Sequence, residues 1–99
     1  MADRASDLLG AMANQKRLII LCRLLDGEMS VNQLVERTGI RQSTMSQHLA
    51  LLRRDNLVTS RSEGQTRLYS LSGHEARRVI ETLYGLYCEP EPQPEGEKD

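Results

Sequence analysis

Apolar side chains recur every three or four positions through the first half of the chain, and this spacing predicts four successive helices. We place them at residues 3–13, 15–25, 30–39 and 42–55. In the first, Leu8, Leu9 and Met12 share one side, with Ser6 or Asp3 as candidate N-cap. A stripe on so short a helix must pack against the rest of the domain or a second subunit.

The second and third helices carry clearer buried faces. In the second, the template of i, i+3, i+4 and i+7 is met by Leu18, Leu21, Cys22 and Leu25. Asp26-Gly27 ends this helix. The third begins at Ser30 as N-cap, ends at Gly39 and points Val31, Leu34 and Val35 inward.

The fourth helix, called the reading helix below, has two unlike faces. Met45, Leu49 and Leu52 form an apolar stripe that requires a core. The opposite face carries short hydroxyl, amide and imidazole groups, whereas a face meant only for water usually carries Glu and Lys. Gly39 fits the tight turn between two short helices, so the pair predicts a helix-turn-helix whose second helix enters a DNA major groove. An ordinary Ser-rich surface helix is the alternative.

After residue 56 the period changes from 3.6 to 2. Runs at 57–62 and 66–71 are rich in β-forming residues, and Glu63-Gly64-Gln65 between them predicts a hairpin loop. Arg61 and Arg67 flank this loop. We therefore expect a basic "wing" whose arginines project from the hairpin tip, rather than a plain cover for the core.

The last helix is expected at 73–88, with an apolar arc wider than one small core needs. Together with the first helix it is our candidate for a two-fold dimer interface. The Pro-rich, acidic segment 89–99 is expected to be a disordered tail, so residues 1–88 form one domain. The expected fold is mainly α with a β-hairpin wing, in the order α-α-α-α-β-β-α, and homodimeric.

Charge supports a nucleic-acid partner once the tail is set aside. The whole chain carries a net charge of -1, but the tail holds five acids and one lysine, which leaves residues 1–88 at +3. Six arginines lie between Arg37 and Arg67 against two acids. Positive charge thus gathers around the reading helix and the wing, as phosphate contact requires.

The candidate DNA contacts fall into two groups. Hydroxyl, amide and imidazole groups match base edges, and Gln47 in particular matches the N6/N7 edge of adenine. Ser43 has an alternative role as N-cap, and His48 as a hydrogen-bonding group inside the domain. The candidates on the reading helix are Gln42, Ser43, Thr44, Ser46, Gln47 and His48. The candidates for the DNA backbone are Arg41, Arg53, Arg54, Arg61 and Arg67.

Several stretches resemble the ArsR-type winged-helix repressors: 11–18, 34–39, 42–53 and 64–71. The Ser-x-x-Ser-Gln-His-Leu core from Ser43 to Leu49 is fairly specific for that family. The resemblance covers about residues 5–88. It implies a homodimer that binds an inverted-repeat operator over a promoter and releases it when an inducer arrives.

The positions of the two cysteines resemble the dithiol, BigR- and HlyU-like branch of that family. Cys22 lies in the second helix and Cys88 ends the last. In that branch the thiols are joined by a disulfide or polysulfide bridge and DNA affinity drops, so the resemblance implies a persulfide, a polysulfide or another thiol oxidant as inducer. Taken alone, Cys22 reads as an inert core residue.

Other readings stay open. A metal-responsive repressor would use the cysteines with His74 or Glu75, but a site needs three or four ligands, so we expect no metal and no cofactor. A regulator with inert thiols is also compatible with the sequence. An enzyme is not expected, since a thiol-disulfide oxidoreductase would carry a Cys-x-x-Cys motif. No segment reaches the roughly 20 apolar residues of a membrane span, the N-terminus is unlike a signal peptide, and we expect a cytoplasmic protein.

Overall fold

The structure, a computed structural model, describes residues 2–88 as five helices, a short π-helical end and a three-stranded sheet. The expected tail at 89–99 lies outside the described residues. In chain order the elements are α1 (Ala2–Met12), α2 (Gln15–Leu24), β1 (Met29–Ser30), α3 (Val31–Thr38), α4 (Gln42–Arg54), β2 (Val58–Glu63), β3 (Thr66–Leu71), α5 (His74–Leu83) and η1 (Tyr84–Cys88). The predicted order of four helices, a hairpin and a last helix is confirmed.

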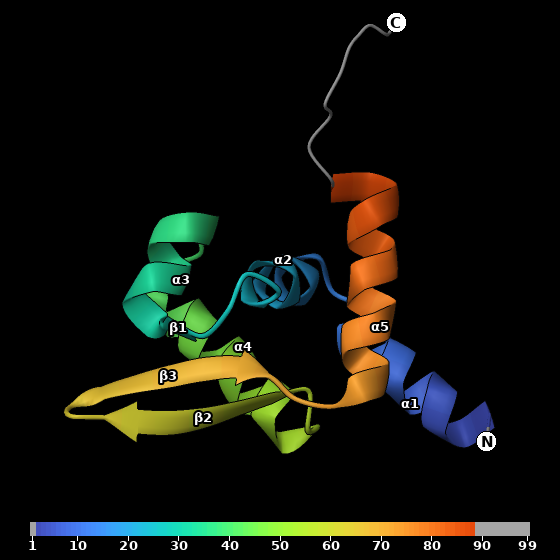
Figure 1. The fold of residues 1–99 in the computed structure, drawn as a ribbon, viewed down its shortest axis with the longest axis horizontal. Coiled ribbons are helices and arrows are strands. Elements are labelled where there is room, and N and C mark those ends of the chain that lie inside the picture. The colour runs from blue at the N-terminus through green and yellow to red at the C-terminus, as the bar shows by residue number, and fades with distance from the viewer. Residues whose placement is uncertain (1, 89–99) are drawn as a thin grey trace, which may run out of the picture.

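Helix α2 is central. It packs against α3, α4, α5 and β3 (Figure 1). Its most buried side chains are Ile20, Leu21 and Leu24, whereas Leu18 and Cys22 are partly buried. The stripe predicted for this helix is therefore only partly right, because the most buried side of α2 is rotated away from it. Almost every residue from 18 to 25 is apolar, so the hydrophobic periodicity cannot tell which side of the helix is innermost.

Helix α1 begins earlier than expected, which places both N-cap candidates, Asp3 and Ser6, inside the helix rather than at its cap. Met12 is buried and Leu8 packs against the core, but Leu9 is 55 % exposed, so the predicted three-residue stripe is only partly right. Figure 1 shows α1 at the foot of α5.

The sheet has one strand more than the sequence predicted. β1 pairs antiparallel with β3, with Met29 opposite Tyr69, and gives the order β1-β3-β2. The hairpin closes more tightly than expected, because Glu63 pairs with Thr66 and leaves a two-residue turn at Gly64-Gln65. Gly64 supplies the left-handed φ of +63° there. The hairpin extends to one side of the molecule, away from α5 (Figure 1).

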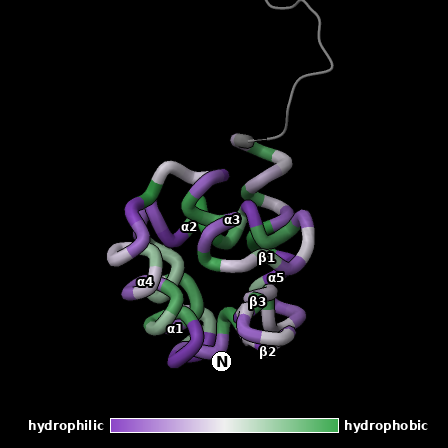
Figure 2. The backbone as a smooth tube through the Cα atoms, turned by 90° about the vertical axis from the view of Figure 1, so that its left-hand side faces the viewer, coloured by the Kyte–Doolittle hydropathy of each residue, from purple (hydrophilic) through white to green (hydrophobic). Residues whose placement is uncertain are grey.

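The hydrophobic core lies between the helices and the base of the sheet. Figure 2 shows hydrophobic stretches of the helices in the middle of the molecule, while the β2–β3 hairpin is drawn mostly as hydrophilic or neutral. The fully buried, largest side chains are Ile20, Leu21, Leu24, Leu34, Met45, Leu49, Leu52 and Ile80. One continuous core of this kind holds α4 on the body of the domain.

The last helix is less buried than its apolar composition suggested. Ala76 and Ile80 are buried and Val79 packs against the core, but Leu86 and Tyr87 are 68 % and 81 % exposed. Both of these lie in η1, at the end of α5 opposite α1 (Figure 1). The apolar arc of the last helix is as wide as predicted, and part of it is exposed on the surface of the domain.

Candidate nucleic-acid interface

The turn between α3 and α4 is held by local hydrogen bonds. Gly39 adopts φ +76°, and its backbone N–H donates to the carbonyl of Val35. Thr38 Oγ1 donates to the Leu34 carbonyl at 2.7 Å and accepts from the backbone N–H of Ile40 at 3.1 Å. Ile40 itself is buried. The angle at which α4 leaves α3 is thus fixed on both sides of the turn.

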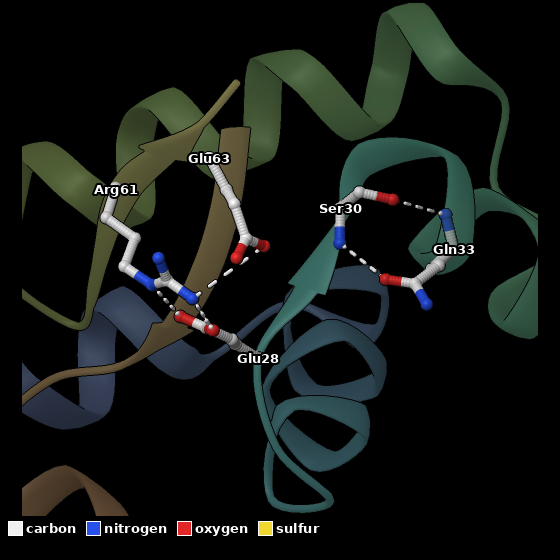
Figure 3. A network of polar contacts seen from close by, with 5 residues as sticks. All are labelled: Glu28, Ser30, Gln33, Arg61 and Glu63. Carbon is white, nitrogen blue, oxygen red and sulfur yellow. Dashed lines mark hydrogen bonds and ion pairs between the residues drawn. The ribbon is translucent and has the colours of Figure 1, made fainter. Parts of the chain in front are cut away.

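The start of α3 is fixed as well. Ser30 Oγ accepts from the backbone N–H of Gln33 at 3.1 Å, and Gln33 Oε1 accepts from the backbone N–H of Ser30 at 2.9 Å (Figure 3). This capping box confirms Ser30 as the N-cap and supplies the partner Gln33, which the sequence analysis missed although its spacing was visible.

Helix α4 presents the two faces that the sequence predicted. Met45, Leu49 and Leu52 are completely buried. Of the six candidates for base contact, Thr44 and His48 are partly buried, and four are exposed: Gln42, Ser43, Ser46 and Gln47. The N-cap position belongs to Arg41 and has no side-chain cap, so Ser43 is not the N-cap. Its hydroxyl lies on the exposed side of the first turn.

His48 forms the hydrogen bond inside the domain that the sequence left as an alternative. Arg17 Nε on α2 donates to His48 Nδ1 at 3.2 Å. Burial, followed by the positive charges of Arg17 and Lys16, lowers the pKa of His48 below its usual 6.5. This shift favours the neutral form of the imidazole at pH 7. Sequence reasoning missed Arg17 because it precedes His48 by 31 positions.

The five candidate arginines differ in how far their charge is already engaged. Arg41 and Arg53 are exposed on α4 or just before it. Arg54 Nε lies 3.3 Å from Asp55 Oδ1. Arg67 Nη1 donates to Ser60 Oγ at 2.9 Å, and no acid within residues 2–88 forms an ion pair with it.

Arg61 does not project from the wing tip, and that expectation is wrong. Its guanidinium donates to the Glu28 carboxylate from Nε at 2.9 Å and from Nη2 at 2.6 Å, and Glu63 lies 3.9 Å from Nη2 (Figure 3). The hydrogen bonds from Arg61, and then its charge, lower the pKa of Glu28. The hydrogen bonds to Glu28, and then the negative charge of Glu28, raise the pKa of Arg61. The wing is thus tied to the loop before β1. Sequence reasoning missed this ion pair, because 33 positions separate the partners.

The two cysteines lie on helices connected by packing. Cys22 is partly buried on α2 and contacts the core, and α2 packs against α5. Cys88 is the last residue of η1, which continues α5. The side chain of Cys88 lies outside the part of the chain described, so the predicted pairing of the two sulfurs stays a prediction.

The described side chains include no group of three His, Cys, Asp or Glu that would hold a metal ion. Glu75, one of the two residues considered for such a site, lies 3.7 Å from Arg4 in an exposed ion pair. Within residues 2–88, no helix is both long and apolar enough to cross a membrane.

Comparison with known proteins assigns a family to the segment that contains α3 and α4. Residues 14–60 match the model of the bacterial regulatory protein, arsR family. The chain is 55 % identical over 86 residues to the transcriptional activator HlyU of Vibrio cholerae, covering 87 % of this chain and 80 % of that protein. It is 40 % identical over 94 residues to the biofilm growth-associated repressor of Agrobacterium fabrum, covering 92 % and 80 %.

Solved structures agree. HlyU from Vibrio cholerae superposes with a TM-score of 0.85 at 53 % identity, covering 89 % of this chain and 96 % of that one. The repressor BigR from Xylella fastidiosa gives a TM-score of 0.82 at 32 % identity, covering 90 % and 91 %. A homodimeric winged helix-turn-helix DNA-binding domain from Mycobacterium bovis gives 0.76 at 30 %, covering 86 % and 79 %.

Proposed function

The chain belongs to the arsR family of bacterial regulatory proteins, which are DNA-binding regulators of transcription rather than enzymes, and we propose that it is a homodimeric, thiol-responsive repressor. In this proposal the dimer binds an inverted-repeat operator in the cytoplasm. Reactive sulfur species or another oxidant bridge Cys22 to Cys88 and lower DNA affinity.

The exposed polar face of α4 is the observation that carries DNA recognition. Gln42, Ser43, Ser46 and Gln47 stand on a helix whose opposite face is completely buried. Rigid packing of this kind holds short polar groups in a fixed orientation, as direct readout of base edges requires. Thr44 and His48 border this face and complete the proposed reading surface.

Arginines around this face supply the proposed phosphate contacts. Arg41 lies at the N-terminal end of α4 and Arg53 and Arg54 at its C-terminal end, so they bracket the reading surface. Arg67 extends the positive charge onto the wing. Such contacts position the protein on the duplex and carry little sequence information. Arg61 joins this group of arginines when a DNA phosphate replaces Glu28 as the partner of its guanidinium.

The exposed apolar side chains outside α4 support a dimer. Leu9 on α1 and Leu86 and Tyr87 on η1 are all more than half exposed. Exposed large apolar side chains are typical of interaction surfaces, and here they stand at both ends of α5, on α1 at one end and on η1 at the other. A two-fold axis through α1, α5 and η1 would pair them with their copies and would set the two reading helices about 34–36 Å apart, one turn of DNA.

Helix α2 provides the proposed route from thiol chemistry to the reading helix, because it contacts both α5 and α4. A Cys22 thiolate that attacks a sulfane sulfur of a polysulfide displaces a shorter polysulfide and forms a persulfide. Attack by the Cys88 thiolate on the inner sulfur then closes a disulfide and releases hydrosulfide. Retained sulfane atoms would give a longer bridge. Either bridge would fix α2 to the end of α5.

The test compares DNA affinity of the reduced and the polysulfide-treated protein by fluorescence anisotropy, using a duplex enriched by in vitro selection. The proposal predicts that treatment weakens wild-type binding roughly 5- to 150-fold, the range typical of allosteric coupling. Cys22→Ser should bind like reduced wild type before and after treatment. Equal affinity of treated and untreated wild type would show that the thiols only fill space.

A further inference from the structure

Arg17 joins three elements next to the reading surface. Its backbone N–H donates to Asn14 Oδ1 at 3.1 Å, in the cap that starts α2. Its guanidinium donates from Nη1 to the Ala11 carbonyl at the end of α1, at 3.3 Å. The same guanidinium donates from Nε to His48 Nδ1 on α4. The side chain is therefore fixed from both ends when it meets the imidazole.

The chemistry of this contact determines the tautomer of His48. A guanidinium has only donors and stays protonated in proteins, so Nδ1 must offer a lone pair. The ring proton then resides on Nε2, which becomes a donor. The lowered pKa of His48 agrees with a neutral ring. Within residues 2–88, Nε2 donates to no protein acceptor.

We propose that Arg17 is a positioning residue for DNA recognition, which holds His48 as a neutral imidazole that donates Nε2–H to an acceptor on the duplex. The inference rests on the proposed function, since it assigns a ligand to one residue of the reading helix. His48 follows the exposed Gln47 and is itself partly exposed, so the ring borders the reading surface. The acceptor is a base-edge oxygen or nitrogen, or a phosphate oxygen.

Substitutions of His48 separate the two edges of the ring. In His48→Asn, the amide oxygen stands close to the place of Nδ1 and can accept from Arg17, but the outer donor is lost. We expect this variant to bind the selected duplex roughly 3- to 10-fold more weakly, the effect of one net hydrogen bond. A loss confined to one base position identifies a base edge as the acceptor, and an equal loss on all duplexes identifies a phosphate. Unchanged affinity would overturn the proposal.

Arg17→Lys tests whether Arg17 acts through His48. The lysine keeps the positive charge but lacks the planar fork that reaches both His48 and Ala11. We expect roughly a 3- to 10-fold loss of affinity in wild type and less than about twofold in the His48→Asn background, because the donor to be positioned is then absent. Additive losses would show that Arg17 contacts DNA independently and would overturn the proposal.

Nitrogen-15 NMR of the imidazole in the DNA-free protein gives a readout that a merely structural role would not change. The wild-type spectrum should show Nε2 protonated and Nδ1 unprotonated, and Arg17→Lys should shift the ring toward a mixture of tautomers. A wild-type ring protonated on Nδ1 would contradict the proposal. The tautomer is measured without DNA. Failure of wild type to bind any duplex would therefore contradict the proposed function, whereas the NMR spectrum tests the tautomer separately.

Discussion

Glu28 and Arg61 form a two-point ion pair that ties the wing to the loop before β1, with donor–acceptor distances of 2.9 and 2.6 Å (Figure 3). Both groups are solvent-accessible, so the pair is screened by water and salt and exchanges readily. A DNA phosphate approaching the wing would compete with the Glu28 carboxylate for the same guanidinium. Glu28 thus sets how much of the positive charge of Arg61 is available to DNA.

Glu28→Gln should therefore tighten DNA binding. Without competition from Glu28 the guanidinium contacts a phosphate more fully, which steepens the slope of log affinity against log salt by up to about 0.9. Anisotropy titrations at several salt concentrations measure both quantities. Glu81→Gln, which removes an acid from the exposed side of α5, is the matched control and should change neither. Weaker binding by Glu28→Gln would mean that the ion pair orients the wing for DNA.

Gln47→Ala should relax sequence choice. Gln47 is exposed on the reading helix, and a side-chain amide paired with adenine contributes about 1–3 kcal/mol of discrimination between bases. The variant should bind the selected duplex more weakly than wild type does. It should bind a duplex changed at the base pair that Gln47 reads in each half-site as well as wild type does. Asn32→Ala, on the exposed side of α3, is the control amide. A uniform loss on every duplex would place Gln47 on the backbone.

Arg67→Ala should have the complementary effect. Loss of a phosphate contact weakens binding on all sequences and flattens the salt slope by about 0.9. Ser60→Ala removes the hydrogen bond that Arg67 makes at 2.9 Å but leaves the charge, so this control should keep the wild-type slope. A slope unchanged in Arg67→Ala would place the side chain away from the duplex.

The sequence predicted best those elements whose two faces contrast sharply. On α4 the first half of the helix is mostly polar, so the spacing of Met45, Leu49 and Leu52 defined a single buried face. The structure buries all three side chains. The resemblance drawn from the Ser-x-x-Ser-Gln-His-Leu core is confirmed by the family match and by the HlyU and BigR structures. In α2 the apolar arc is so wide that the hydrophobic periodicity could not identify the buried face.

Long-range polar contacts were beyond sequence reasoning. Arg17 and His48 are 31 positions apart, and Glu28 and Arg61 are 33. Nothing local distinguishes these arginines from their neighbours, and both pairs arise only when the folded core brings α2 and its following loop against α4 and the wing. Strand β1 was missed for a similar reason, since two residues show no period.

Leu86→Glu should dissociate the proposed dimer. Leu86 is 68 % exposed in the single chain, and a carboxylate at an apolar interface must be desolvated without a partner. Sedimentation velocity should show wild type as a dimer and the variant as a monomer with weaker DNA binding. Arg77→Glu, on the exposed side of α5, is the charge-changing control and should remain dimeric. A monomeric wild type would contradict the proposed dimer interface.

Acid should destabilise the protein through His48. Its pKa in the folded protein lies below the unfolded value of about 6.5, owing to burial and then to Arg17 and Lys16. The unfolded state therefore binds more protons, and the free energy of unfolding falls as pH drops from above 6.5 through the folded pKa. Urea unfolding at pH 7.5 and 5.5 measures the change.

His48→Gln should reduce this loss, and His74→Gln, which removes the chain's other histidine, is the control. Identical pH dependence in wild type and His48→Gln would mean that the imidazole makes no differential contribution to folding.

In vitro selection from a random-duplex library, using the reduced full chain, tests the central claim that two reading helices of a symmetric dimer recognise DNA. We expect enrichment of an inverted repeat whose half-sites lie one helical turn apart, about 10–10.5 base pairs centre to centre. Enrichment of no sequence, or of an isolated half-site without symmetry, would contradict it.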